Sequence, residues 1–210
     1  MNLPLFSIRN IYPADFFHVR SVGRYGDAIR RVTGSVGTHD ALFLNGHTVG
    51  ESTVKPPRAH ETDLEVYEDR MRKGLVTVSI LRIPDISMSD RYAISAAWFR
   101  HVRGTPYDFL GIAKLFFKER AMAMLPEDSD FGEKAVGWEF AHWCTEGNRK
   151  ACIMGSRLRP DGTIDPLAKE NPTPRTVENR VRDGRLIDVT SFCLTEEGLQ
   201  YRLQIPEKVG

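Results

Sequence analysis

The sequence predicts a single α+β domain. The chain has 210 residues, which fits one domain of ordinary size. Segments of strand-like composition lie mostly in the first 83 residues, and segments with helical periodicity follow them. This order is typical of an α+β fold rather than of a doubly wound sheet. Hydrophobic residues make up 41% and charged residues 27% of the chain, which excludes a disordered or fibrous protein.

The first part of the expected sheet contains a β-hairpin. We expect strands over residues 27–32, 40–44 and 47–54, and the last two of them form the hairpin. Asn45-Gly46 lies between the last two strands and is a strong local signal for a tight turn. The following residues, 55–74, carry two prolines and many charges, and they predict a loop with a short exposed helix. The β-branched run 75–83 predicts a buried strand that ends at Pro84.

The turn type decides which residue lies opposite His39. In a three-residue loop with Gly46 in the left-handed conformation, His39 is paired with Glu51. In a two-residue type I′ loop, Ser52 takes that place and Glu51 points to the other face of the sheet. Both registers are open from the sequence.

The later segments are mainly helical. Ser87 or Ser89 is a suitable N-cap for a helix that ends near Arg103. Further helices are expected over residues 109–124, 143–155 and 176–182, with a polar loop at 126–137 and short edge strands at 186–190 and 201–205.

Charge and hydropathy exclude several classes of protein. Lys and Arg total 29 against 28 Asp and Glu, so there is no broad basic footprint for nucleic acid. No run approaches the roughly 18 apolar residues of a membrane span. The first 20 residues lack the pattern of a secretory signal, so we expect a cytoplasmic protein by default, or one delivered by other machinery. Three cysteines without CxxC spacing indicate a reducing compartment.

Cys144 is the candidate nucleophile. It lies where the polar loop turns into a helix, and a cysteine in a first helical turn is near unsatisfied N–H groups that favour the thiolate. The alternative for any isolated cysteine is a small buried hydrophobe, and this is what we expect of Cys152 and Cys193.

A nucleophilic cysteine needs a base, and His39 is the best placed of the six histidines. It opens a strand directly after Gly37-Thr38 and can project from the end of a rigid sheet. Glu51 would hold its ring in the tautomer that accepts the thiol proton. His142 is too close in sequence to Cys144 to face it, and His18 and His60 are expected to be solvated. A zinc site of Cys144, His39 and His142 lacks a further ligand, so no metal or organic cofactor is expected.

Five short motifs occur in an order that resembles a known family. They are Gly26-Asp27-Ala28-Ile29, Thr38-His39-Asp40-Ala41-Leu42, Val49-Gly50-Glu51-Ser52, Gly104-Thr105-Pro106-Tyr107-Asp108-Phe109 and Trp143-Cys144-Thr145-Glu146. The chain resembles the circularly permuted NlpC-type papain-like cysteine hydrolases, the branch with YiiX-like proteins and lecithin retinol acyltransferase relatives. The match spans roughly residues 24–155, and residues 156–210 would be a C-terminal extension.

The resemblance implies a papain-like domain with an antiparallel sheet or partly closed barrel packed on helices. It implies Cys144 as nucleophile, His39 as base, Glu51 as the third member, and Tyr107 as a residue that supports the substrate or the oxyanion. Many relatives have Ser at the position of Thr145 and a small aliphatic residue at that of Asp40.

The expected reaction is hydrolysis of an amide or peptide bond through an acyl-enzyme intermediate. An acyltransferase or esterase acting on an acyl lipid or thioester is the second reading. A binding module that has lost turnover is the third.

Overall fold

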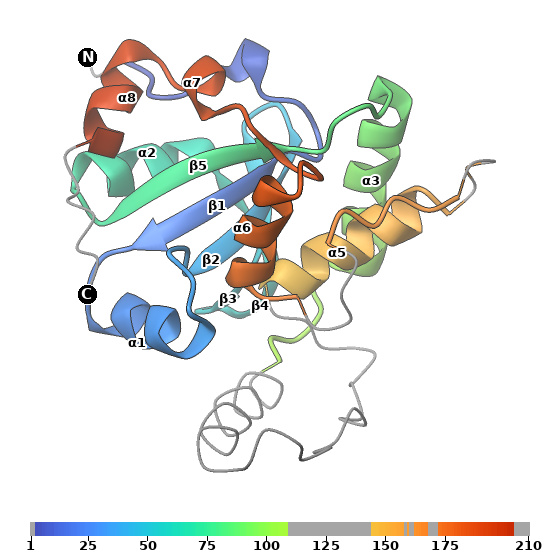
Figure 1. The fold of residues 1–210 in the computed structure, drawn as a ribbon, viewed down its shortest axis with the longest axis horizontal. Coiled ribbons are helices and arrows are strands. Elements are labelled where there is room, and N and C mark those ends of the chain that lie inside the picture. Colours follow the sequence, from blue (N-terminus) through green and yellow to red (C-terminus); the bar gives the residue numbers. More distant parts are fainter. Residues whose placement is uncertain (1–2, 109–143, 158, 160–161, 168–171, 204–210) are drawn as a thin grey trace.

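The computed structural model describes residues 3–108, 144–157, 159, 162–167 and 172–203 (Figure 1). The predicted helix at 109–124 and the predicted polar loop at 126–137 lie outside these ranges. Within them, no helix is long and apolar enough to cross a membrane.

The centre of the molecule is a six-stranded, open antiparallel sheet in the order β4-β3-β2-β1-β5-β6, so the predicted α+β class and antiparallel sheet are confirmed. The strands are β1 Phe16–Ser21, β2 His39–Asn45, β3 Thr48–Val54, β4 Pro57–Asp63, β5 Val76–Arg82 and β6 Ile187–Asp188. The predicted buried strand at 75–83 corresponds to β5, and the expected edge strand near 186–190 corresponds to the short β6.

Helices cover both faces of the sheet (Figure 1). They are the 3-10 helix η1 Ile8–Asn10, α1 Arg24–Thr33, α2 Leu64–Arg72, α3 Met88–His101, α5 Cys144–Gly155, α6 Pro174–Arg182, α7 Thr190–Cys193 and α8 Glu196–Leu203. Helices α3 and α5 pack on each other and on β2, whereas α2, α7 and α8 lie against β5.

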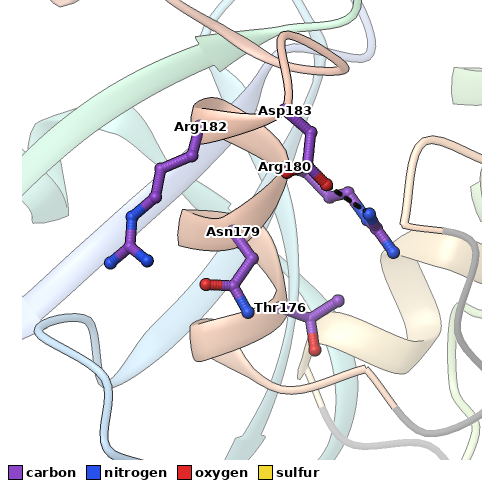
Figure 2. Close-up of a pocket in the computed structure, with 5 residues that line it drawn as sticks. All are labelled: Thr176, Asn179, Arg180, Arg182 and Asp183. Atoms are coloured by element: carbon purple, nitrogen blue, oxygen red, sulfur yellow. Dashed lines mark hydrogen bonds and ion pairs between the residues drawn. The ribbon is translucent and has the colours of Figure 1, made fainter.

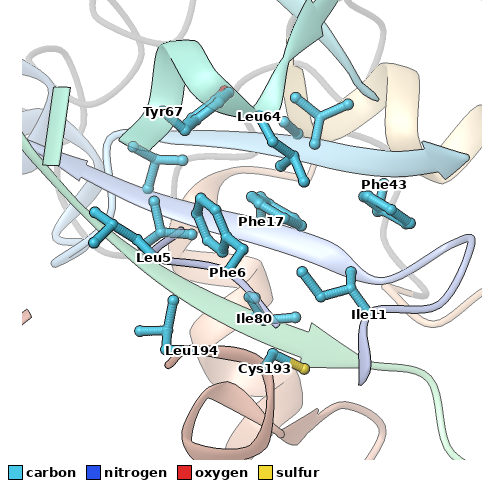
Figure 3. Packing of buried hydrophobic residues seen from close by; sticks show 14 of the residues in the cluster. Leu5, Phe6, Ile11, Phe17, Phe43, Leu64, Tyr67, Ile80, Cys193 and Leu194 are labelled. Carbon is cyan, nitrogen blue, oxygen red and sulfur yellow. The ribbon is translucent and has the colours of Figure 1, made fainter. Parts of the chain in front are cut away.

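Strand alternation divides the core into two hydrophobic clusters. Successive residues of one strand enter different clusters: Phe17 packs in the cluster with Tyr67 of α2, and Phe16 packs in the one with Trp98 of α3. Figure 3 shows the first cluster, in which Phe17 and Phe43 stack with their ring centroids 6.1 Å apart.

Glycines permit close packing at two contacts, that of α3 on β3 and that of α5 on α3. Ser87 caps α3 as expected, in a capping box with Asp90. A β-carbon on Gly50 would lie 2.3 Å from the buried ring of Trp98. One on Gly155 would lie 2.4 Å from the Cα of Ile94, so α5 approaches the α3 backbone directly.

The β2–β3 hairpin forms, with Gly46 at the expected positive φ of 51°. The register shifts by one residue between Phe43 and Asn45, so the strand contains an irregularity at Leu44. The Ser95 hydroxyl of α3 donates to the Leu44 carbonyl at 2.7 Å. The recorded pairs are Leu42 with Gly50, Phe43 with Val49, and Asn45 with Thr48.

Neither predicted register is therefore correct. Continuing the pairing from Leu42 and Gly50 places Ala41 opposite Glu51, whereas the predictions placed either Glu51 or Ser52 opposite His39. His39 and Ala41 are two residues apart and share a face of the sheet, so His39 is a diagonal neighbour of Glu51.

The predicted strand at 27–32 is wrong, because these residues belong to helix α1. The carboxylate of Asp27 pairs with Arg30 one turn later, and Arg30 also donates to the Ser21 carbonyl at 2.7 Å. Gly34, with a φ of 61°, ends the helix. The Gly26-Asp27-Ala28-Ile29 motif therefore opens no strand, and the central strand β1 comes before it.

Two further expectations are corrected. Residues 55–74 form the edge strand β4 and helix α2, whose buried Tyr67 and Met71 anchor it to the core. The expected strand at 201–205 is helical as far as Leu203, in α8, where Gly198 packs against the Leu5 carbonyl.

Candidate active site

His39 is the first residue of β2, and its ring reaches the neighbouring strand. Its Nε2 lies 2.7 Å from Oε2 of Glu51 on β3, so the contact that the sequence predicted is present although the register is different. The Glu51 side chain is only 2% exposed, and that of His39 is 19% exposed. A carboxylate so deeply buried needs donors around it, because an unpaired buried charge is strongly unfavourable.

Two hydroxyl groups supply those donors. Thr62 on β4 donates to Oε1 of Glu51 at 2.5 Å, and Tyr67 on α2 donates to Oε2 at 2.6 Å. Nε2 of His60 lies 3.8 Å from Oε1. Burial acts to raise the pKa of Glu51, but the hydrogen bonds from His39, Thr62 and Tyr67 outweigh it and lower the pKa to about 2. Glu51 is therefore a carboxylate at neutral pH.

Cys144 is the first residue of α5 and is 7% exposed. Burial acts to lower the pKa of the His39 ring, but its charge interaction and hydrogen bond with Cys144, together with Glu51, raise the pKa well above its ordinary 6.5. The imidazolium form of His39 is thus stabilised on both sides. Since Nε2 is held by Glu51, Nδ1 is the nitrogen left to exchange a proton with the thiol.

The structure therefore brings together a thiol, an imidazole and a buried carboxylate from α5, β2 and β3. In this arrangement the base is oriented by the acid and lies beside the nucleophile. The chemistry that such a set can perform is attack of a thiolate on an electrophilic carbon, followed by proton donation from the imidazolium.

The other two cysteines have a different environment. Cys152 is fully buried in the core, and burial raises the pKa of its thiol. Burial also raises the pKa of Cys193, to about 11, and its Sγ lies 3.2 Å from the Asn10 carbonyl. Both are neutral thiols at neutral pH, so neither is suited to nucleophilic attack.

Sequence reasoning missed a second histidine–carboxylate pair beside Cys144. His18, expected to be solvated, is mostly buried on β1, and its Nδ1 lies 2.7 Å from Oδ1 of Asp40 on β2. The hydroxyl of Thr145, the residue after Cys144, donates to Oδ2 of Asp40 at 2.5 Å. Strand alternation alone could have placed the Asp40 side chain on the face of the sheet opposite to that of His39. The pairing with His18 needs the position of β1, which the sequence did not reveal.

The remaining residues considered for the site are Tyr107 and His142. The backbone N–H of Tyr107 donates to the Pro57 carbonyl at 3.0 Å, which holds this residue against the start of β4. Its role at the site stays a prediction. His142, considered as a metal ligand, lies outside the described residues. Among the residues that are described, no cluster of three or more His, Cys, Asp or Glu could hold a metal ion.

A polar hollow of about 270 Å³ lies on α6 and is separate from these residues (Figure 2). Its Arg180 side chain is held by Asp183 at 2.5 Å and by the Leu167 carbonyl at 2.8 Å. The lining residues are Thr176, Asn179, Arg180, Arg182 and Asp183.

Comparison with known proteins gives no match to the chain. No protein-family model matches the chain, and no curated protein matches it either.

Proposed function

We propose that this protein is a cysteine hydrolase of the permuted papain-like type, in which Cys144 attacks an acyl carbon. The observation that carries the proposal is the buried Glu51 carboxylate, which binds Nε2 of His39 at 2.7 Å while the same ring interacts with Cys144. The resemblance of the motifs around His39, Glu51 and Cys144 to the permuted NlpC-type hydrolases supports the same assignment.

In the proposed reaction, His39 takes the thiol proton and Cys144 attacks the carbonyl carbon of an amide or peptide bond. The imidazolium of His39 then protonates the leaving amine, which leaves the acyl group on Sγ as a thioester. A water molecule, deprotonated by His39, attacks the thioester and releases the acid and the free thiol. The backbone N–H of Cys144 points from the first turn of α5 and is suited to stabilise the oxyanion.

Glu51 keeps the imidazolium in place through these steps. Its carboxylate is fixed by Thr62 and Tyr67 before any substrate binds, so the ring needs no reorganisation during the reaction. This preorganisation is the reason to prefer an enzyme over a binding module, which would need no imidazole fixed by a carboxylate beside a thiol.

The test is covalent capture by a panel of acyl-directed probes on the native chain, followed by mass spectrometry of the labelled peptide. Capture at Cys144 by an amide-mimicking probe is the expected result. Preferential capture by lipid-ester or thioester probes would favour an acyltransferase or esterase. A Cys144 that reacts no faster than the cysteine of an unfolded peptide would overturn the proposal.

A further inference from the structure

Strand β2 presents two consecutive side chains to the opposite faces of the sheet. His39 turns toward Glu51, and Asp40 turns toward helix α5. There it accepts the Thr145 hydroxyl, and both of these side chains belong to fully buried residues. Strand β2 therefore carries His39 itself and, at the next position, the carboxylate that binds Thr145, the residue after Cys144.

Asp40 is itself held from the other side by His18. The two residues are direct cross-strand partners of β1 and β2, and their side chains are 2.7 Å apart. The His18 ring lies tightly under Gly37, where an added β-carbon would come within 2.1 Å of it. The ring is thus confined by backbone as well as by its partner.

Glu178 on α6 completes the chain of contacts. Its Oε1 lies 3.4 Å from Nε2 of His18. The same oxygen accepts hydrogen bonds from the Ser35 hydroxyl at 2.6 Å and from the backbone N–H groups of Val36 and Gly37 at 2.6 and 3.0 Å. These residues form the segment that leads into His39, so Glu178 holds the backbone that precedes His39.

We propose that Glu178, His18, Asp40 and Thr145 form a positioning network that sets the Cys144 thiol against His39. The network links α6, β1, β2 and α5, and it reaches the reacting sulfur through Thr145, whose hydroxyl oxygen lies 3.8 Å from Sγ of Cys144. Its four members are positioning residues for the proposed cysteine hydrolase, on which this inference rests. Charge is consistent with the assignment, since Asp40 and Glu178 raise the pKa of His18 to about 9 against the effect of burial.

The experiment measures how fast limiting iodoacetamide alkylates Cys144 in the native chain between pH 5 and pH 9, with the label located by mass spectrometry. The test variant is Thr145→Val, which keeps the shape of the side chain and removes the hydroxyl. Thr145→Ser restores the hydroxyl. Thr190→Val is the matched control, because Thr190 is also fully buried at the start of a helix, α7, and its hydroxyl also donates to a carboxylate, that of Asp188 on β6.

The expected result is that Thr145→Val slows alkylation of Cys144 at pH 7 by about tenfold or more, since small misplacements of a reacting group cost this much. Because Cys144 is then displaced from the His39 ring, the shape of its labelling profile between pH 5 and pH 9 should change as well. Thr145→Ser should react within about twofold of the wild type. Thr190→Val should lower thermal stability and leave the labelling profile unchanged.

Glu178→Gln is the second variant, and it is needed in every case because Thr145→Val also removes the direct contact between the hydroxyl and Sγ of Cys144. Glu178→Gln removes the charge beside His18 from a half-buried helix position, and alkylation should slow about threefold or more. A wild-type labelling profile in either folded variant would overturn the network while Cys144 stays reactive. An unreactive wild-type Cys144 would instead refute the proposed function itself.

Discussion

Two histidine–carboxylate pairs lie on opposite faces of strand β2, and the nitrogen–oxygen distance is 2.7 Å in both. They differ in what else the ring meets. In the pair of His39 and Glu51, the ring also interacts with the Cys144 thiol. In the pair of His18 and Asp40, the second ring nitrogen lies 3.4 Å from a second carboxylate, that of Glu178.

The comparison shows that a histidine–carboxylate pair does not by itself identify a catalytic base. A ring between a carboxylate and a thiol can accept the thiol proton and later donate it to a leaving group. A ring between two carboxylates is instead a cation that holds them together. The pair on the first face is suited to chemistry, and the pair on the second face is suited to fixing the geometry.

The sharpest test of this contrast removes the thiol. Cys144→Ala should abolish capture by acyl probes and turnover of any substrate, a loss of about 10³-fold or more, because no other described group can replace the sulfur. Probe capture is measured by mass spectrometry, and unchanged thermal unfolding is the control. Full activity in a folded Cys144→Ala protein would remove the cysteine-hydrolase assignment.

Removal of the base should have nearly the same effect. His39→Ala should slow alkylation of Cys144 at pH 7 by about 10²-fold, since general bases contribute on this order. At pH 9 to 10 the difference should narrow, because hydroxide then ionises the thiol. Rapid labelling of His39→Ala at neutral pH would mean that another group is the base.

The third member should matter less than the base it orients. Glu51→Gln keeps an oxygen that can accept from the His39 ring, but it no longer stabilises the imidazolium with a charge. Alkylation of Cys144 at pH 7 should slow by about tenfold. Loss as large as that of His39→Ala would show that Glu51 has a further role.

His18→Gln tests the second face, and its main effect should be on stability. The pKa of folded His18, about 9, lies above the ordinary 6.5, so the charged ring stabilises the fold fully below pH 6.5 and loses this effect as the pH rises through 9. At about 1.4 kcal/mol per pKa unit, the stabilisation is about 3 kcal/mol at most.

Chemical denaturation at several pH values measures this effect. The difference in unfolding free energy between the wild type and His18→Gln should be largest near pH 6 and should shrink toward pH 10. Alkylation of Cys144 should slow only about fivefold through the positioning network. A pH-independent difference in stability would show that His18 is neutral in the folded protein.

The smallest effect is expected at Tyr67. Tyr67→Phe removes one of the hydrogen bonds to Glu51, while those with His39 and Thr62 remain. Unfolding free energy should fall by about 1 kcal/mol, and labelling of Cys144 should slow about two- to threefold. A larger kinetic loss would show that the carboxylate depends on Tyr67 for its charged form.

Local signals made part of the fold predictable. Asn45-Gly46 located the hairpin, and the two candidate caps Ser87 and Ser89 located the start of α3, which Ser87 caps. The strand β1 was missed and residues 27–32 were misassigned, because pairing of Phe16–Ser21 with two distant strands, rather than local composition, decides where the central strand lies.

The site was predictable to the same extent. His39 and Glu51 are 12 residues apart in one hairpin, and their contact is present although the register differs from both predictions. The turn lies at residues 46–47 rather than at the predicted 44–46 or 45–46, and the irregularity at Leu44 shifts the pairing once more. The second pair depends on β1 and α6, and Glu178 is 143 residues from its partner Ser35. No pattern within one segment carries information about a contact of that kind.

The close crossing of α3 and α5 couples the position of Cys144 to packing at the far end of α5. Helix α5 is a rod of 12 residues, about 18 Å long, with Cys144 at one end and Gly155 at the other. A methyl group at position 155 would have to push the rod away from Ile94, and a stiff rod displaced at one end also moves at the other. Alanine at this glycine would therefore reduce the reactivity of a sulfur one full helix length away, so variants that lose activity need not lie anywhere near the thiol.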